Sequence, residues 1–400
     1  MLDREKVIVA FEQKRAAFQE FLDSQQQQRR LLSDWLEQFH RLDAQGLLAK
    51  LAELDIGWPG ALPTPELDRA HRLCLAFAVR WNNHAQARQW ALSVLEGRPV
   101  AAVDGSQITP TKDLSIPIGA VQVGWFVNDH LPGGSYIKDV EFEVLAPHEL
   151  AQEEGDAPDE RGFPDWRVNQ LRFERECEKL CDLMARYADG AEPARPLCFF
   201  DGSFIISFAG QMRPERARPY LAAVQAMLAC SEQCRVPLVG YVDSSYSRDL
   251  VALVEAVTGH SVGAGMTDST MLSSLLPNWG DRSPVFVCAR SDALSEEGRA
   301  DFYREVAFVY VRLTQDRPPA RVELPYWLAV EGRVDEVLDR VRAECVVGAG
   351  YPYAVETADA VAVIGQQDRR RFYALFEQFA HAQQLSLVQS RKARSKESRR

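Results

Sequence analysis

The sequence predicts an α/β fold, in which a mixed sheet is flanked by helices and a helical attachment precedes the sheet. Three observations support this prediction. Apolar residues recur at helical intervals in the first 46 residues. Segments that alternate between apolar and polar residues, as strands do, lie between residues 98 and 145. Farther along, short continuous apolar runs alternate with helical patterns, which is typical of strands covered on both faces.

Residues 1–96 are predicted to form the helical N-terminal region. Apolar residues from Phe11 to Phe39 recur among Gln, Arg and Glu, so a first helix is expected there. The stretch GWPGALP at 57–63 interrupts the pattern. A second helix is predicted from Thr64, an N-cap residue followed by proline, to about Leu95.

Residues 97–380 are predicted to form the main domain. The predicted elements begin with a strand from Pro99 that turns at the Asp104-Gly105 pair, followed by strands at 116–127 and 135–145 and a helix at 166–187. Next come a strand from Arg195 that ends near Asp201-Gly202-Ser203, a helix at 213–231 and a strand at 236–243. This order, a meander of three strands followed by strands that helices connect, is that of an RNase H-like fold. In such a fold the fourth strand lies beside the first, so the ends of these two strands meet in space.

The remaining segments follow simpler patterns. An acidic loop that contains Gly and Pro is expected at 148–166. After residue 244 we expect a helix at 246–258, three further strands and then helices from residue 334 onward. Residues 381–400 are predicted to be a basic tail, whose last ten residues carry six positive charges and one negative charge.

The composition bears on location and partners. Of the 400 residues 46% are hydrophobic, but no apolar run is long enough to cross a bilayer, and the N-terminus lacks the features of a signal peptide. We therefore expect a cytoplasmic protein with no membrane partner. The net charge of −11 argues against a strong general DNA binder that acts alone, because phosphate contacts need Lys and Arg. A partner that delivers DNA would resolve this conflict.

Two predicted strands end in the same triplet, Asp104-Gly105-Ser106 and Asp201-Gly202-Ser203. A single Asp-Gly pair is usually a turn. Here each triplet follows an apolar run, at the point where a buried strand would end. Two carboxylates at neighbouring strand ends repel each other unless a cation lies between them. Because Mg²⁺ and Mn²⁺ prefer oxygen ligands, the paired triplets predict a divalent metal site.

The helix between the two triplets is rich in glutamate. Its segment RFERECEKL contains Glu174, Glu176 and Glu178. Glu176 shares a helix face with the apolar Phe173 and Leu180, so it would face the sheet and complete the metal site. Glu174 is the alternative, whereas Glu178 is expected to be a solvated surface charge.

These elements resemble the NurA family of nucleases over roughly residues 97–365. NurA nucleases carry a DGS triplet at the end of the first strand, an Arg-then-Glu helix, a second DG[ST]-like strand end and a late G-Y-P-x-x-L-x-x-A-H element. The counterparts here are AAVDGS with Asp104, RFERE with Glu176, CFFDGS with Asp201, and GYPYAVETAD at 350–359. The paired triplets with GYP downstream are more specific together than any one of them alone.

The late element matches the family in one position and departs from it in another. Tyr351 corresponds to the family's tyrosine, but Asp359 stands where the family has histidine. An aspartate can ligate Mg²⁺ or Mn²⁺ as a histidine can, so the site could keep its metal. The substitution could equally mean that catalysis is weakened or lost.

The resemblance implies a metal-dependent deoxyribonuclease. Asp104, Glu176, Asp201 and Asp359 would hold Mn²⁺ or Mg²⁺, and Tyr351 would position a water or a phosphate oxygen. The resemblance further implies a homodimer that docks on a HerA-type hexameric ATPase and resects DNA ends during double-strand break repair.

Two other functions stay open. A non-catalytic adaptor would keep the fold and the docking surface for the ATPase, and the departure at Asp359 and the acidic net charge both favour it. An actin-like phosphotransferase would also place Asp-Gly at strand ends. Against it, neither DGS triplet extends to the longer D-x-G-[ST] phosphate loop.

Overall fold

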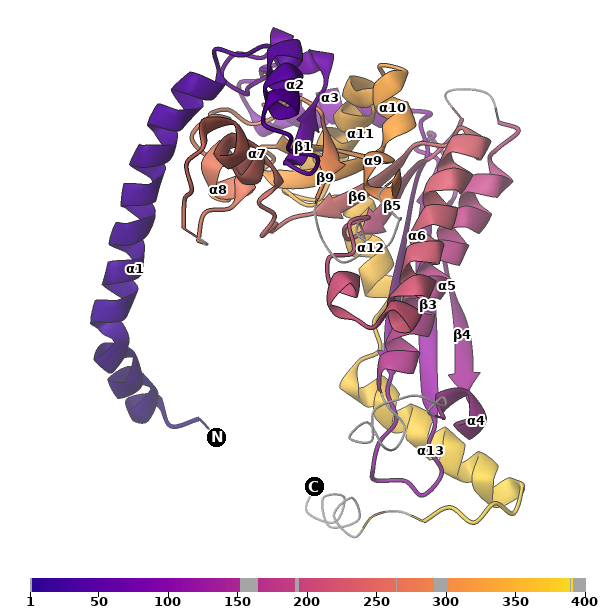
Figure 1. Ribbon diagram of the computed structural model, residues 1–400. Helices are drawn as coiled ribbons and strands as arrows, with labels where there is room; N and C mark the ends of the chain where they lie inside the picture. Colours follow the sequence, from indigo (N-terminus) through magenta and orange to yellow (C-terminus); the bar gives the residue numbers. More distant parts are fainter. Residues whose placement is uncertain are drawn as a thin grey trace. The chain divides into compact units, whose positions relative to one another are not determined.

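The computed structural model describes residues 2–151, 165–190, 194–263, 265–290, 301–388 and 390 (Figure 1). The chain forms two compact units. The first unit comprises residues 1–80 and 241–330, and the second comprises 81–240 and 331–400. The predicted boundaries after residues 96 and 380 stay predictions. Most of the predicted acidic loop, and the charged end of the predicted tail, lie outside the described residues.

The second unit contains the predicted meander. Strands β2 (Val100–Ile108), β3 (Gly119–Asn128) and β4 (Tyr136–Leu145) pair in antiparallel fashion, and β5 (Leu197–Asp201) pairs in parallel with β2. With β6 (Leu238–Val242), whose last two residues belong to the first unit, the strand order is β6-β5-β2-β3-β4. The fourth strand of this series lies beside the first in a mixed sheet, so the predicted RNase H-like arrangement is confirmed.

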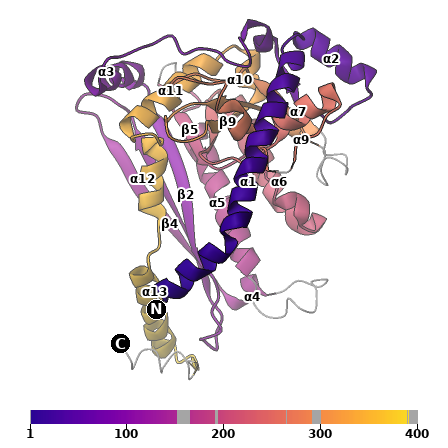
Figure 2. The same cartoon turned by 90° about the vertical axis from the view of Figure 1, so that its left-hand side faces the viewer.

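Helices cover both faces of this sheet. On one face, α5 (Asp165–Arg186) packs against β2 and β3, and α6 (Pro214–Cys234) lies beside α5 (Figure 1). On the other face, α12 (Tyr353–Ala362) packs along β2 and β3 (Figure 2). The other helices of the second unit are α3 (His84–Leu95), α4 (Pro147–Leu150), η3 (Ala209–Gln211), α11 (Val334–Val347) and α13 (Gln366–Ala382).

Two glycines show which face each helix covers. A Cβ at Gly105 of β2 would lie 2.2 Å from the Glu176 carboxylate of α5. A Cβ at Gly124 of β3 would lie 2.7 Å from the backbone nitrogen of Ala362 at the end of α12. Gly124 is the antiparallel partner of Asp104, and paired residues share a face of the sheet. Asp104 therefore faces α12, whereas the next residue, Gly105, faces α5.

The first unit has its own antiparallel strands in the order β1-β7-β8-β9. These are β1 (Gly60–Pro63), β7 (Phe286–Ala289), β8 (Val306–Val311) and β9 (Ala320–Pro325). Its helices are α1 (Arg4–Phe39), α2 (Ala44–Glu53), η1 (Pro65–Arg69), α7 (Asp249–Thr258), α8 (Asp268–Leu272), α9 (Asp301–Arg304) and α10 (Tyr326–Val330). The first predicted helix, the helix expected at 246–258 and the three late strands are all present. Among the described residues, no helix is both long enough and apolar enough to span a membrane.

The second predicted helix, from Thr64 to about Leu95, is wrong. Only a short 3-10 helix follows Thr64, and α3 begins at His84. Between them Arg72 and Leu73 have positive φ angles of 49° and 59°, which an α-helix does not allow. Leu73 fits the apolar spacing of a helix, but it lies in a turn and is only 1% exposed there. Its burial therefore does not indicate a helix face. The predicted loop at 57–63 likewise contains strand β1.

We expect Gly124→Ala to destabilise the protein, because the new Cβ would press on the backbone of α12, which cannot move aside as a flexible side chain can. Overpacking of this kind costs about 1–3 kcal/mol. The measurement is urea unfolding, with Gly57→Ala as the control, since a Cβ at Gly57 meets nothing within 4 Å. Equal unfolding midpoints for the two variants would contradict the close approach of α12 to β3.

Candidate functional site

The register of two parallel strands brings the DGS triplets together. Val103 of β2 pairs with Phe200 of β5, so the next residues, Asp104 and Asp201, lie at the same level on neighbouring strands. Asp201 ends β5, as predicted. The prediction that the first triplet also ends a strand is wrong, because Asp104, Gly105 and Ser106 still pair with β3 and β2 continues to Ile108. Adjacent strands lie about 4.8 Å apart. Asp104 is half-buried and Asp201 is exposed at the strand end. The two carboxylates that the sequence singled out are therefore neighbours.

The late sequence element approaches the same two aspartates. The Tyr351 hydroxyl donates a hydrogen bond to Asp201 Oδ1 at 2.9 Å. Two residues later α12 begins, and its first turn is fastened by Glu344 of α11, whose Oε2 accepts a bond from the backbone N–H of Ala354 at 2.8 Å. Asp359 lies on this helix, exposed to solvent, and its charge acts on Asp104.

The glutamate of α5 reaches the site from the other face of the sheet. Glu176 is 6% exposed and lies against Gly105, where only a glycine leaves room for its carboxylate. Arg172, one helical turn earlier, donates to Glu176 Oε1 at 2.6 Å and to the carbonyl oxygen of Gly105 at 3.2 Å. This arginine therefore joins α5 to β2 beside Asp104.

The carboxylates perturb one another's ionisation. The pKa of Asp104 is raised to about 6. Burial is the largest cause, the charges of Asp201 and Asp359 act in the same direction, and a backbone hydrogen bond from Gly105 and the charge of Arg172 oppose it. The pKa of Glu176 is raised to about 7, again mainly by burial, with Arg172 opposing the shift and Asp104 and Asp201 adding to it. The site thus holds more negative charge than its one arginine compensates, which is a condition that a cation would relieve.

The donor chemistry fits a hard divalent cation, because all four candidate ligands are carboxylates. The positions of these four side chains, however, do not form a metal site as they stand. Within the residues that the structure describes, no three His, Cys, Asp or Glu side chains are placed so that they could hold a metal ion as they stand. Glu176 instead bonds to Arg172. Binding an ion would require these side chains to turn toward one another, and their assignment as metal ligands stays a prediction.

Several candidate residues lie elsewhere. The alternative ligand Glu174 accepts a hydrogen bond from Gln170, and Glu178 pairs with Arg175 at the surface, as the sequence predicted for it. The five candidate site residues all belong to the second unit.

Sequence reasoning missed two residues that shape the site. Arg172 could have been found from its spacing, since it precedes Glu176 by four residues on the same helix face. Glu344 had no such signal, because its partner Ala354 is known only once α11 and α12 are packed.

The sequence model of the NurA domain matches residues 98–364 of this chain. The chain belongs to the NurA family. The matched range contains the paired DGS triplets, the glutamate helix and the GYP element, and NurA proteins are nucleases. The resemblance inferred from these motifs is therefore confirmed at the level of the family.

Solved structures similar to this chain include NurA proteins and an endonuclease. A crystal structure of NurA with manganese shares 10% identity, covers 89% of this chain and 98% of its own, and has a TM-score of 0.39. A structure of NurA bound to dAMP and manganese has a TM-score of 0.42 at 10% identity, with coverage of 70% and 88%. The catalytic domain of human Endonuclease V gives 0.34 at 12% identity, with coverage of 82% and 96%. Comparison with curated proteins gives no match.

The raised pKa values predict how stability without metal depends on pH. Because Asp104 and Glu176 titrate higher in the folded protein than their ordinary values of 3.8 and 4.5, the folded state binds more protons. Stability is therefore lost as pH rises from about 4 to about 7, and the loss is complete above that range. Asp104→Asn removes one of these charges, so it should raise the melting temperature in EDTA at about pH 8 and change it little at about pH 4.

The control for this measurement is Asp139→Asn, on the exposed face of β4, which should leave the melting temperature unchanged at both pH values. A melting temperature that Asp104→Asn lowers equally at both pH values would show that the carboxylates are not under mutual repulsion.

Proposed function

We propose that this chain is a deoxyribonuclease that depends on a divalent cation, Mn²⁺ or Mg²⁺. The observation that carries the proposal is the parallel register of β2 and β5, which sets Asp104 and Asp201 side by side on adjacent strands. Membership of the NurA family supports a phosphodiester hydrolase. The uncompensated negative charge of the site supports a cation there.

In the proposed mechanism Asp104, Glu176, Asp201 and Asp359 hold the cation. When bound, it supplies Lewis acidity, which makes water a stronger nucleophile near neutral pH and stabilises the leaving oxygen. The Tyr351 hydroxyl fixes the orientation of the Asp201 carboxylate by donating a hydrogen bond to it. When Glu176 turns away from Arg172, the guanidinium N–H that bonded to it can donate to a phosphate oxygen.

The partners are proposed from the family resemblance. We propose that the protein acts as a homodimer, docks on a HerA-type hexameric ATPase and resects DNA ends in double-strand break repair. The net charge of −11 supports a partner that brings DNA to the site, because a chain with this charge gains little from non-specific attraction to phosphates.

A non-catalytic adaptor of the same ATPase is the second candidate, and two observations favour it. Asp359 replaces the family's histidine. The candidate ligands, as they stand, are also not arranged to hold an ion. The actin-like phosphotransferase has no comparable support, since the family match is to a nuclease domain.

The first test of the proposed nuclease is Asp201→Asn. This change removes a negative ligand but keeps the side chain's size and can still accept a bond from Tyr351. Cleavage of linear DNA in Mn²⁺ should fall by more than about 100-fold. A residue that only supports a metal ligand usually costs at most about 100-fold when it is mutated, so a larger loss indicates a ligand. Asp139→Asn is the matched control and should cleave at the wild-type rate. Normal cleavage by Asp201→Asn would place the catalytic site elsewhere.

A second test separates the nuclease from the adaptor at Asp359. If Asp359 is a ligand, Asp359→Ala should lose most of the activity, while Asp359→His should keep it with a preference moved from Mg²⁺ toward Mn²⁺, since imidazole suits Mg²⁺ poorly. The measurement is a cleavage time course for wild type and both variants in each metal. An inert wild type that Asp359→His activates would establish the adaptor, and full activity in Asp359→Ala would remove this residue from the site.

A further inference from the structure

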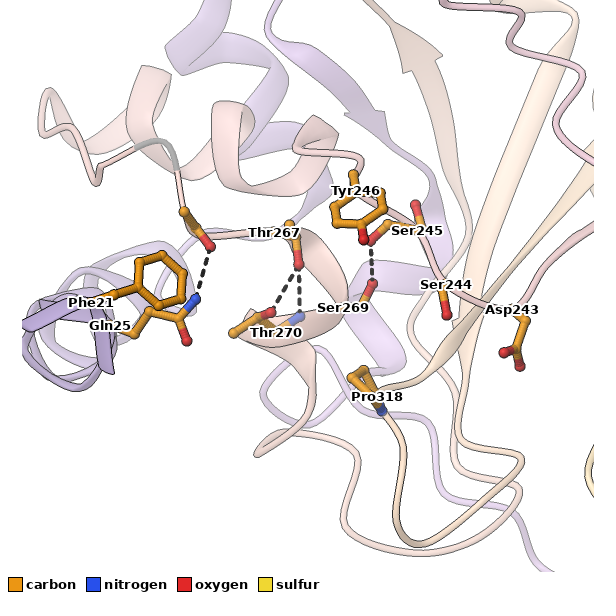
Figure 3. A pocket seen from close by; sticks show the side chains of 11 residues that line it. Phe21, Gln25, Asp243, Ser244, Ser245, Tyr246, Thr267, Ser269, Thr270 and Pro318 are labelled. Atoms are coloured by element: carbon orange, nitrogen blue, oxygen red, sulfur yellow. Dashed lines mark hydrogen bonds between the residues drawn. The ribbon is translucent and has the colours of Figure 1, made fainter. Parts of the chain in front are cut away.

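The first unit contains a pocket of about 360 Å³ whose lining comes entirely from that unit (Figure 3). Pockets that bind small ligands or parts of larger ones start at about 300 Å³. Four segments form its walls: α1, the loop after β6, the stretch that leads into α8, and the loop before β9. None of the candidate ligands of the proposed nuclease belongs to this unit.

Buried ion pairs hold the loop after β6 in place. Asp249, at the start of α7, accepts bonds from Arg290 and Arg321 at 2.9 and 2.7 Å. Arg290 also donates to the hydroxyl of Ser247 in the loop itself at 2.8 Å.

The wall that carries α8 is fixed in the same way. Asp268 accepts bonds from the Val251 N–H and the Tyr310 hydroxyl, and Ser269 donates to the Ser245 carbonyl at 3.1 Å. Both walls are therefore ordered before any ligand arrives, which lowers the entropic cost of binding.

The lining surface is mostly apolar, with several hydroxyl groups and no positive charge. Its side chains include the hydroxyls of Ser244, Thr267 and Thr270, and no Lys or Arg is among the lining residues. The one carboxylate, Asp243, is paired with Arg317 at 3.3 Å. A phosphate would find no cation among the lining residues and one carboxylate close by. The pocket therefore suits a neutral group that can both donate and accept hydrogen bonds.

Two aromatic rings add a flat apolar surface. Tyr246 is 88% exposed and Phe21 of α1 is 55% exposed, and both line the pocket. In Figure 3 the hydroxyls of Thr267 and Thr270 lie between these two rings. A ring exposed to this degree contributes little to folding, whereas it is well suited to stacking on a planar ligand.

We propose that this pocket binds an unpaired nucleobase of a DNA strand. The base would stack on Tyr246 and bond through its edge to Ser244 and the threonine hydroxyls, while the phosphates stay outside the pocket. That the ligand is DNA rests on the proposed nuclease function, whereas the planar, neutral and hydrogen-bonding character of the ligand rests on the lining. Stacking on an aromatic ring is tolerant of sequence, so the pocket would favour single-stranded ends of any sequence.

The test compares two single strands of equal length, an oligothymidylate and an oligonucleotide with abasic sites throughout, which keeps the phosphates and lacks the bases. Binding to the full-length protein is followed by fluorescence anisotropy in EDTA. The wild type should bind the oligothymidylate about tenfold more tightly than the abasic strand, as expected for one stacked base. Tyr246→Ala should abolish this preference and Tyr246→Phe should keep it.

Tyr326→Ala is the matched control, since Tyr326 is also a partly exposed tyrosine of the first unit but does not line the pocket. It should keep the wild-type preference. The proposal is overturned if Tyr246→Ala keeps the preference, if the wild type binds both strands equally, or if it binds neither. A peptide competitor that displaces neither strand agrees with the proposal. If the protein binds the peptide but no DNA, the pocket is a peptide site and the proposal is wrong.

The binding assay does not depend on cleavage, so the two proposals can fail separately. A protein that prefers bases but cuts no DNA in Mn²⁺ would keep the base pocket and lose the nuclease. A protein that cuts DNA but shows no base preference would keep the nuclease and lose the base pocket.

Discussion

The parallel pairing of β2 with β5 is the constraint on which the rest of the candidate site depends. It fixes Asp104 and Asp201 side by side on adjacent strands, where two negative charges repel each other. The surrounding residues accommodate that arrangement. Gly105 leaves room for the glutamate of α5, Gly124 lets α12 approach the other face of the sheet, and Arg172 supplies positive charge beside Gly105. Each of these features would be a needless restriction if the two aspartates were simple turn residues.

Two buried carboxylates, one in each unit, differ in how they are compensated. Burial alone would raise the pKa of Asp249 in the first unit, but Arg290 and Arg321 hold it below its ordinary value. These ion pairs help to order the loops around them. In the second unit Glu176 is paired with Arg172, yet its pKa is raised to about 7. A pocket that is ordered and neutral suits a base, whereas a cluster with excess negative charge suits a cation.

The sequence predicted the parts of this protein that follow from local pattern. Alternation and helical spacing gave the order of the strands and helices in the second unit, and the repeated triplet pointed to Asp104 and Asp201 before their register was known. What it missed depends on packing between distant segments. Leu73 has helical spacing yet is buried from a turn, because its environment is set by residues about 200 positions away, such as Arg282, which pairs with Leu75 beside it. The base pocket could not be predicted either, since its walls come from four separate segments.

A crystal structure of the protein grown with Mn²⁺ would show whether the neighbouring carboxylates of Asp104 and Asp201 bind a divalent cation. Anomalous diffraction at the manganese edge locates the ion without reference to activity. We expect an anomalous peak between Asp104 and Asp201, with Glu176 turned away from Arg172 toward the ion. A map with no peak there, in crystals where the pair between Arg172 and Glu176 is intact, would contradict it.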